Sequence, residues 1–388
     1  MRIAHVITRL ILGGAQENTV LCCEDLLHTY GDDVLLITGP PLGPEGSLTQ
    51  RAEAAGIPMH IIPSLRRPIH PWRDARAYFQ LKSVLRDFQP DVVHTHSAKG
   101  GILGRAAAWS LAVPAIVHTV HGAPFHPYQS APARMAIRAC ERWAARRCHA
   151  MISVADRMTE LMVAGRVAPA EKFTTILSGM EVEPFLESDR LRQRARRELG
   201  YTPDQIVIVK VARLFHLKGH EYLVRAAEQV VQTVPNARFL LVGDGILQDR
   251  IRRQIETAGL AEHFQFTGLV PPERIPELLA ASDLVVHASL REGLARVLPQ
   301  ALIAGKPVIS FDVDGTRQVV LPNETGFLVP PRNATALAKA IVRLATSGEL
   351  RTRLGSQGRA RFANAFGHQQ MTADIRGLYL RLLQGAKA

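Results

Sequence analysis

The sequence is poor in cysteine. Its 388 residues include four, Cys22, Cys23, Cys140 and Cys148, and they show neither a CxxC motif nor the Cys/His spacing of a zinc site. This spacing excludes a disulfide scaffold and predicts reduced thiols in a cytoplasmic protein.

Long apolar runs are also lacking. The longest weakly polar stretch, 106–120, contains Pro114 and His118 and falls short of the roughly 20 apolar residues that a spanning helix needs. At the N-terminus Arg2 and Arg9 lie within the apolar stretch, and no small-residue cleavage site follows. We therefore expect a first β-strand there and not a signal peptide.

Negative charge and aromatic residues are under-represented. Lys and Arg number 47 against 35 Asp and Glu, giving a net charge of +12, and aromatic residues make up 6% of the chain. The positive charge favours an anionic partner such as a phosphate group, nucleic acid or an acidic membrane surface. Nucleic acid is disfavoured because no basic stretch is interleaved with aromatic residues as in single-strand binding proteins.

What the chain has in abundance is alternation of short β-branched runs with helical patterns, in both halves. At this length two domains are expected, and the alternation predicts an α/β protein with two Rossmann-like, doubly wound domains that bind a ligand at the carboxyl ends of their strands. The polar segment 184–200 carries no strand signal and suggests the boundary. We predict domains at 1–185 and 186–366, with a C-terminal helix over 367–388 that crosses back to the first domain.

The most informative segment of the second half is VIVKVARLFHLKGHEYL, residues 207–223. It predicts a strand, a loop and a helix, with Arg213 and Lys218 in the loop. A helix N-terminus attracts anions through its free N–H groups and dipole, and the two cations add charge. The segment therefore predicts a phosphate site, although a solvated loop would have the same composition.

A second loop-to-helix segment, SLREGLARVLPQAL, spans residues 289–302. Pro299 is tolerated only in a first helical turn, so the helix should begin near Leu298. Glu292, Gly293 and Leu294 then lie in the loop before it and Gln300 in its first turn. The glycine turn at Gly243 and Gly245 also follows a strand, and we expect all these residues to meet at one site.

In the first half, Gly13 and Gly14 precede a helix and would let the backbone approach a ligand closely. The G-x-G-x-x-G nicotinamide motif is incomplete, which disfavours an oxidoreductase. A plain tight turn would also explain the two glycines.

Histidines lie near strand ends, His94 and His96 in one segment and His118 and His121 in another. No carboxylate accompanies them at ligand spacing, so we predict no metal site. His121 is the candidate for ligand contact, and His94 is expected to be a buried structural residue.

Asp312 and Asp314 form a D-x-D pair, a motif that binds divalent metal with a nucleotide-sugar in other folds. It comes late, after the fifth strand expected in the second half. We interpret it as a turn at the same site, with Arg213 and Lys218 neutralising the phosphates in place of a metal ion.

These segments together resemble the retaining glycosyltransferases of family 4, which have the GT-B fold of two Rossmann-like domains facing across a cleft. The resemblance rests on the order of the following motifs: GGA at 13–15, HTHSAKGGILGR at 94–105, HTVHG at 118–122, ILSGMEVEPF at 176–185, VARLFHLKG at 211–219, VGDG at 242–245, SLREGL at 289–294 and ETGFLVPP at 324–331.

The resemblance implies that the second domain binds a nucleotide-sugar, commonly UDP-linked, and that the first domain holds the acceptor. Arg213 and Lys218 match the pair that binds the donor diphosphate, and Glu292 matches the first glutamate of the E-x7-E motif at the donor sugar. His121 matches a histidine beside the sugar and its phosphate, and Gly14 matches a glycine near the diphosphate.

Three motifs depart from the family pattern. Gln300 stands where the second glutamate of E-x7-E accepts hydrogen bonds from the ribose, and its amide oxygen accepts without charge, which predicts a weaker contact. Ser178 and Glu181 replace the Asn and Asp of the linker motif. Arg317–Gln318 replaces the usual Pro-Glu.

Arginines recur every four residues at Arg134, Arg138, Arg142 and Arg146. On a helix they form one broad basic face. This face is either solvated or a docking surface for an anionic membrane, where each basic residue contributes about 1 kcal/mol.

The sequence thus predicts a retaining, metal-independent glycosyltransferase that needs no cofactor. It would move a hexose from a nucleotide diphosphate-sugar to a glycan or lipid-linked acceptor in envelope polysaccharide synthesis, at the inner face of the cell membrane. A GT-B sugar-nucleotide epimerase and a non-catalytic sugar-binding protein remain alternatives.

Overall fold

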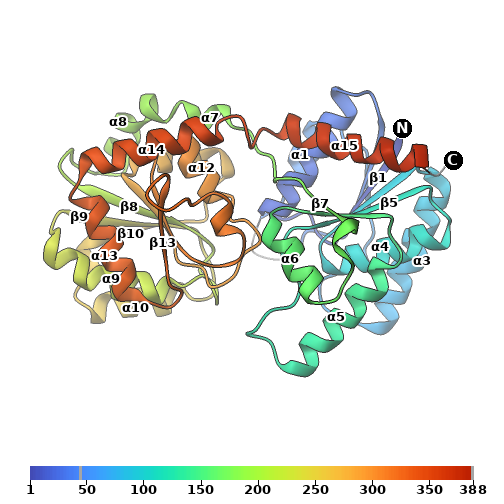
Figure 1. Cartoon of the computed structure of the whole chain (residues 1–388), viewed down its shortest axis with the longest axis horizontal. Coiled ribbons are helices and arrows are strands. Elements are labelled where there is room, and N and C mark those ends of the chain that lie inside the picture. Colours follow the sequence, from blue (N-terminus) through green and yellow to red (C-terminus); the bar gives the residue numbers. More distant parts are fainter. Residues whose placement is uncertain (43–45, 386–388) are drawn as a thin grey trace. The chain divides into compact units, whose positions relative to one another are not determined.

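The computed structural model describes residues 1–42 and 46–385. The chain forms two compact units. The first comprises Met1–Met180 together with the chain from Phe366 onward, and the second comprises Glu181–Ala365 (Figure 1). Both are α/β units with parallel sheets, which confirms the predicted fold class.

In the described residues the first unit has a seven-stranded sheet in the order β3-β2-β1-β4-β5-β6-β7. Its strands are β1 (Arg2–Ile7), β2 (Asp33–Thr38), β3 (Met59–Ile61), β4 (Val92–His96), β5 (Ala115–Val120), β6 (Ala150–Ser153) and β7 (Phe173–Thr175). Its helices are α1 (Gly14–His28), α2 (Thr49–Ala54), α3 (Pro71–Phe88), α4 (Ala98–Ser110), α5 (Ala131–Ala145), α6 (Asp156–Ala164) and α15 (His368–Gly385).

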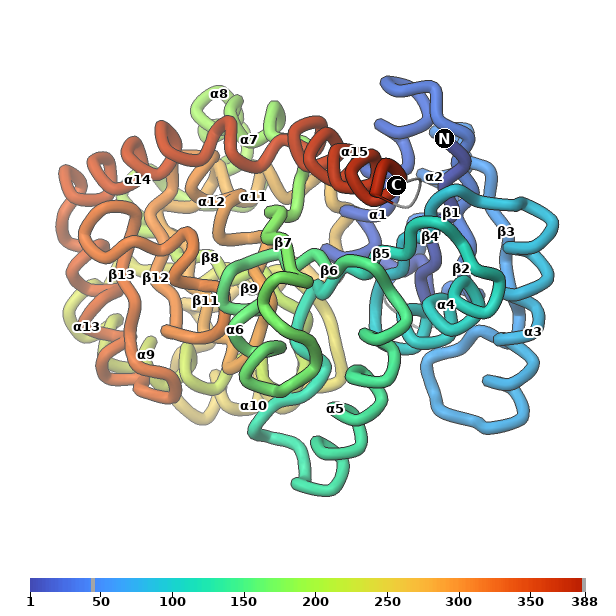
Figure 2. The backbone as a smooth tube through the Cα atoms, turned by 45° about the vertical axis from the view of Figure 1, so that its right-hand side comes forward, coloured from blue at the N-terminus to red at the C-terminus, as the bar shows by residue number. Residues whose placement is uncertain are grey.

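Helices cover both faces of this sheet. The core on one face joins α1 and α15 to β1, β2 and β4, through residues such as Ile3, Leu26 and Ile375. On the other face α4 contacts β1, β4 and β5 and lies between α3 and α5. Figure 2 shows α15, the last helix of the chain, beside α1, the first.

The second unit has a six-stranded sheet in the order β10-β9-β8-β11-β12-β13. Its strands are β8 (Ile206–Val211), β9 (Ala237–Val242), β10 (Phe264–Gly268), β11 (Leu284–His287), β12 (Val308–Phe311) and β13 (Gly326–Val329). Its helices are α7 (Glu183–Leu186), α8 (Ser188–Glu198), α9 (His220–Thr233), α10 (Gln248–Thr257), α11 (Ile275–Ala281), α12 (Val297–Ile303), α13 (Ala334–Ala345) and α14 (Gly348–Phe362).

The boundary between the units falls at Met180, earlier than the predicted residue 185. The cause is the polar segment from Glu181 on, which forms α7 and α8. Both helices contact α11 of the second unit. Arg192 and Arg196 of α8 also pair with Asp283, at 2.7 and 3.2 Å. The segment from residue 367 forms α15 in the first unit, as expected from the sequence.

Candidate active site

The predicted donor residues of the second unit lie where its strand order reverses. From β8 the chain proceeds to β9 and β10 on one side, then returns to place β11 on the other side of β8. The loops after β8 and β11 therefore diverge at the carboxyl ends of two neighbouring strands. In open α/β sheets this switch point is where ligands bind. Lys218 follows β8 and Glu292 follows β11, so the fold brings the two predicted segments together.

Lys218 and Glu292 form a direct ion pair across this point. The Lys218 ammonium donates a hydrogen bond to Oε1 of Glu292, and the two side chains are 20% and 23% exposed. Burial alone would raise the pKa of Glu292. The charge of Lys218 and the contact with His287 outweigh burial and hold the pKa of the Glu292 carboxyl well below its usual range. Glu292 is therefore an anion at neutral pH.

The loop that carries Glu292 is held by the D-x-D turn. The backbone N–H of Glu292 donates to Oδ2 of Asp314 over 2.7 Å, and the N–H of Gly315 donates to the carbonyl of Gly293 over 3.0 Å. Asp312 is paired with Arg317, whose Nε lies 2.7 Å from its Oδ1. Both aspartates thus have protein partners in the turn.

Arg213 lies in the same loop as Lys218. Its guanidinium is exposed and sits over the ring of Phe215, 5.2 Å from the centroid. Its carbonyl oxygen is 3.1 Å from Nε2 of the buried His220, at the start of α9. This contact fixes the loop on the helix N-terminus. The loop geometry thus presents a cation beside the first turn of α9, as an anion site requires.

The turn at Gly243 and Gly245 packs closely against the loop that follows β8. A Cβ on Gly243 would lie 2.4 Å from the carbonyl oxygen of Ala212, and one on Gly245 would lie 2.6 Å from that of Leu214. Both glycines also have positive φ, 131° and 155°. The chain itself requires them, because the turn packs against the loop that carries Arg213. The expectation that they serve close approach of a ligand is not needed to explain them.

The helix after β11 begins within one residue of its predicted start. Helix α12 begins at Val297, with Pro299 in its first turn. Gly293 and Leu294 lie in the preceding loop and are buried, and Gln300 is partly exposed in the helix.

Sequence reasoning missed Lys210, which is 1% exposed on β8. Its Nζ has no hydrogen-bond partner among the described residues. Burial, reinforced by the charge of Lys218, lowers its pKa to about 7. The sequence feature that could have identified it is a lysine within the apolar run VIVKVA.

In the first unit, α1 begins at Gly14, and Gly13 precedes it with a φ of 172°, which any residue adopts. A Cβ at Gly13 would meet only the flexible side chain of Gln16, at 2.8 Å. The fold itself therefore does not require glycine at position 13. Ligand approach remains the predicted reason for it.

The histidines of the first unit are separated by strand alternation. His94 and His96 face α15 together with His5, which the sequence analysis did not single out. His118 faces the other side, where its Nδ1 lies 2.9 Å from Oγ1 of Thr95. His121 follows β5, and its Nε2 lies 3.1 Å from Nδ1 of His96.

His94 is fully buried, with partners on both ring nitrogens. It is thus the structural residue that we expected. His5, His94 and His96 together form a group that could hold a metal ion by proximity, contrary to the simple spacing argument.

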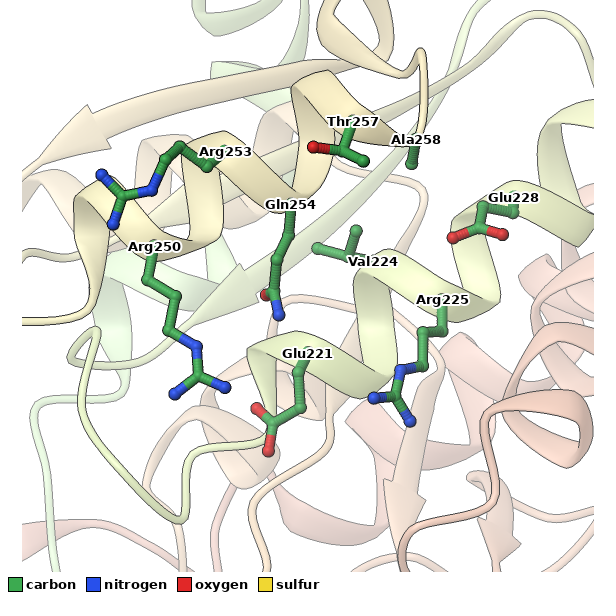
Figure 3. Close-up of a pocket in the computed structure, with 9 residues that line it drawn as sticks. All are labelled: Glu221, Val224, Arg225, Glu228, Arg250, Arg253, Gln254, Thr257 and Ala258. Carbon is green, nitrogen blue, oxygen red and sulfur yellow. The ribbon is translucent and has the colours of Figure 1, made fainter.

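A surface pocket of about 480 Å³ lies between α9 and α10 of the second unit. Figure 3 shows three arginines (Arg225, Arg250 and Arg253) and two glutamates (Glu221 and Glu228) around it. It contains none of the predicted site residues, and its charges of both signs do not single out an anionic ligand. We therefore assign the candidate site to the switch point.

Two family matches cover most of the chain. Residues 192–361 match the family described as Glycosyl transferases group 1, and residues 16–179 match the Glycosyl transferase 4-like domain. The boundary between the two matches falls close to the boundary between the structural units.

Among curated relatives, the chain is 28% identical to the UDP-Gal:alpha-D-GlcNAc-diphosphoundecaprenol alpha-1,3-galactosyltransferase of Escherichia coli, over 99% of this chain and 97% of the relative. It is 29% identical to the putative glycosyltransferase EpsD of Bacillus subtilis (strain 168), over 82% and 84%.

Solved structures share the fold. HepE of Anabaena in complex with UDP and glucose matches with a TM-score of 0.82 and 22% identity, over 97% of this chain and 99% of that one. WaaG, a glycosyltransferase involved in lipopolysaccharide biosynthesis, matches with a TM-score of 0.75 and 17% identity, over 96% and 99%. With its two matching domains, its GT-B fold and its named relatives, the chain belongs to the group 1 glycosyltransferases and is an enzyme of that class.

Proposed function

We propose that the chain transfers a hexose from a UDP-linked donor to a lipid diphosphate-linked glycan, with retention of configuration and without a metal ion. The observation that carries this proposal is the Lys218–Glu292 pair at the switch point of the second sheet. It supplies a cation for the leaving diphosphate and an anion for the sugar within one small site.

In this proposal the Arg213 guanidinium and the Lys218 ammonium bind the diphosphate. Their contacts strengthen as negative charge accumulates on the leaving group, which is what lowers the barrier. Glu292 binds hydroxyl groups of the sugar, and Gln300 accepts a hydrogen bond from the ribose. His121 of the first unit contacts the sugar and its phosphate.

The D-x-D pair supports a site that needs no metal ion. Asp312 is engaged by Arg317, and Asp314 accepts from the amide of Glu292. Recruiting both for a cation would break the turn that positions Glu292. The two basic side chains of the β8 loop would then neutralise the phosphates.

The acceptor is proposed from the Escherichia coli relative, whose name specifies a diphosphoundecaprenol-linked GlcNAc and which matches along 99% of this chain. None of the helices in the described ranges has both the length and the apolar character needed to cross a bilayer. A lipid-linked acceptor therefore calls for a surface that docks on the membrane, which we place on the cytoplasmic side.

That surface is proposed on the first unit. The three tryptophans of the chain, Trp72, Trp109 and Trp143, are 84%, 47% and 44% exposed. They lie on α3, α4 and α5, which are neighbours on one face of the sheet. Tryptophan is enriched where proteins meet the membrane interface. Beside Trp143, Arg142 and Arg146 line a pocket of about 420 Å³ with Arg166 and Lys172.

The predicted arginine face of α5 is only partly available to lipid. Arg138 packs over the ring of Phe125, 4.8 Å from its centroid, and Nε of Arg142 donates to the carbonyl of Arg166 over 2.6 Å. Arg134 and Arg146 are left as the main candidates for contact with lipid phosphates. Met135, which is 68% exposed, adds apolar surface.

The proposal is tested by incubating the purified protein with UDP-galactose or UDP-glucose and a short-chain GlcNAc-diphosphate lipid in excess EDTA. We expect turnover to continue and the new linkage to be α. Lys218→Ala should lower kcat/KM by about 100-fold or more, the scale seen when one transition-state donor is removed. Lys339→Ala, on α13, is the matched control.

Three results would refute it. They are activity that needs a divalent cation, a β-linked product, and release of an epimerised sugar in the absence of acceptor.

A further inference from the structure

A chain of buried histidines runs behind His121 in the first unit. Nε2 of His121 lies 3.1 Å from Nδ1 of His96, and Nε2 of His96 lies 3.0 Å from Nδ1 of His5. The rings of His5 and His96 are stacked, with an interplanar angle of 11°. His5 and His96 are 0% and 1% exposed. Two side chains that ligand cannot reach are therefore hydrogen-bonded in series to one that we propose contacts the donor.

The chain is fixed in place by His94. Its Nδ1 lies 2.5 Å from the hydroxyl of Tyr379 on α15, and its Nε2 lies 2.7 Å from Oγ1 of Thr119 on β5. The ring of His94 packs against that of His96, with centroids 4.2 Å apart. Partners on both ring nitrogens prevent His94 from turning, and its ring in turn confines His96.

These contacts also weigh against a metal ion in the group His5, His94 and His96. Both nitrogens of His94 and both of His96 already have hydrogen-bond partners. In the described part of the chain, Nε2 of His5 is the ring nitrogen of this group with no partner. One available nitrogen does not make a site for zinc, which needs three or four ligands.

The proton count decides the direction of the hydrogen bonds. A neutral imidazole carries one N–H. If His121 donated to His96, then His96 would donate to His5, and the proton of His5 would sit on Nε2 as a buried donor without an acceptor. In the opposite direction His5 donates from Nδ1 to His96, and His96 donates from Nδ1 to His121. The partnerless Nε2 of His5 is then a bare nitrogen, which avoids the rare case of an orphaned buried donor.

We propose that His5 and His96 are positioning residues that hold His121 with its proton on Nδ1 and its Nε2 occupied as an acceptor. His121 then meets its ligand as a hydrogen-bond donor and not as a general base. This inference concerns the His121 contact of the proposed function and rests on it for its catalytic meaning, while the proton position itself does not depend on the donor.

The surroundings keep the chain uncharged. Burial lowers the pKa of His5 to about 3 and, with the neighbouring rings, lowers the pKa of His96 and His94 well below the usual range. Each inner ring therefore carries a single proton at neutral pH.

The test is the tautomer of His121 in protein labelled with 15N-histidine, read from the nitrogen chemical shifts of its ring. The His121→Gln spectrum identifies its signals. We expect Nδ1 protonated and Nε2 unprotonated in the unmodified protein and in His5→Asn, whose amide can still donate at the position of Nδ1. In His96→Leu the donor to Nε2 of His121 is removed, and the two tautomers of His121 should mix.

Kinetics provide the second readout. His96→Leu should lower kcat at least about tenfold, as is common when an orienting partner is lost, with KM for the donor little changed. His5→Asn should retain most of the activity. A proton on Nε2 of His121 in the unmodified protein would overturn the proposal, even if no variant folds.

An unchanged His121 tautomer in folded His96→Leu would also overturn it. So would displacement of the His5, His94 and His96 signals by added zinc, which would reveal a metal site. If instead the tautomer is as expected but no UDP-sugar is turned over, the proposed function fails and the assignment of the proton stands.

Discussion

The Glu292 carboxylate is paired with Lys218 and is also proposed to bind the donor sugar. Without a donor it is paired with Lys218, and burial and charge act in opposite directions on its pKa. In the proposed donor site, a bound diphosphate gives the Lys218 ammonium a second anion to bind. The carboxylate and the diphosphate then compete for one cation and repel each other.

This competition predicts the effect of Glu292→Gln. The amide keeps the shape of the side chain, releases Lys218 and removes a negative charge beside the phosphates. We expect the variant to bind UDP about tenfold more tightly, for a change near 1.4 kcal/mol, while sugar transfer falls at least about 100-fold. Calorimetry with UDP measures the first effect. Glu324→Gln removes an exposed carboxylate elsewhere and should leave UDP affinity unchanged. Weaker UDP binding by Glu292→Gln would contradict the competition.

Some of these residue contacts could be predicted from sequence and some could not. Lys218 and Glu292 were assigned to one site by the rule that ligands of doubly wound domains bind at the carboxyl ends of the strands. Gly243 and Gly245 were assigned to ligand approach, because a sequence does not show which backbone packs on a glycine. His5 was missed because the sequence does not show which residue lies beside it. The register of β1 and β4 places it opposite His94.

At the scale of elements, the loop from β8 to α9 depends on one glycine. Gly219 precedes α9 with a φ of 67°, and a Cβ there would lie 1.9 Å from the carbonyl oxygen of Ala288 at the end of β11. The neighbour is backbone and cannot rotate away. Gly219 permits this close approach, and the N–H of Leu290 joins the two loops by donating to the carbonyl of Leu217 over 2.8 Å.

Gly219→Ala should therefore separate the two loops. We expect the second unit to lose about 2 to 4 kcal/mol of stability, since a left-handed conformation and a steric clash are combined. UDP affinity should fall with it. The midpoint of urea unfolding gives the stability. Gly348→Ala is the control, because a Cβ there meets nothing closer than 3.7 Å and alanine favours the α14 helix. Equal midpoints for the two variants would show that Gly219 is not under this constraint.

Among the elements, two edge strands were not predicted. β7 has three residues, all partly exposed, and β13 has four residues, beginning with glycine. Such short segments give too few residues for alternation to be recognised. They are ordered by pairing with β6 and β12, which is a tertiary effect. The interior strands β6, β11 and β12 also have only four residues each, but all of these are buried, and such apolar runs indicate strands in the sequence.

At the scale of the whole molecule, the exposed tryptophans are unevenly placed. The chain carries a net charge of +12, and its tryptophans all lie on neighbouring helices of the first unit. Composition alone indicated an anionic partner without saying where it binds. The structure places the exposed tryptophans on α3, α4 and α5. The arginine spacing of α5 did not indicate this aromatic surface.

The membrane proposal predicts binding of the protein to vesicles with anionic lipid at low salt. Arg134→Gln combined with Arg146→Gln should weaken this binding about 30-fold, at about 1 kcal/mol for each basic residue. Co-sedimentation measures it. Arg250→Gln combined with Arg253→Gln removes the same charge from the second unit and should have little effect. Failure of the unmodified protein to bind, or equal loss in both variants, would rule out this surface.

The central claim is that the Lys218 ammonium binds the donor diphosphate at the switch point of the second sheet. Calorimetric titration of Lys218→Ala with UDP tests it most directly, beside the unmodified protein and Lys339→Ala. The account predicts that UDP affinity falls at least about tenfold in Lys218→Ala, as expected for a lost charge-assisted hydrogen bond of about 1.5 to 3 kcal/mol, and is unchanged in Lys339→Ala. Equal UDP affinity in all three proteins would contradict it.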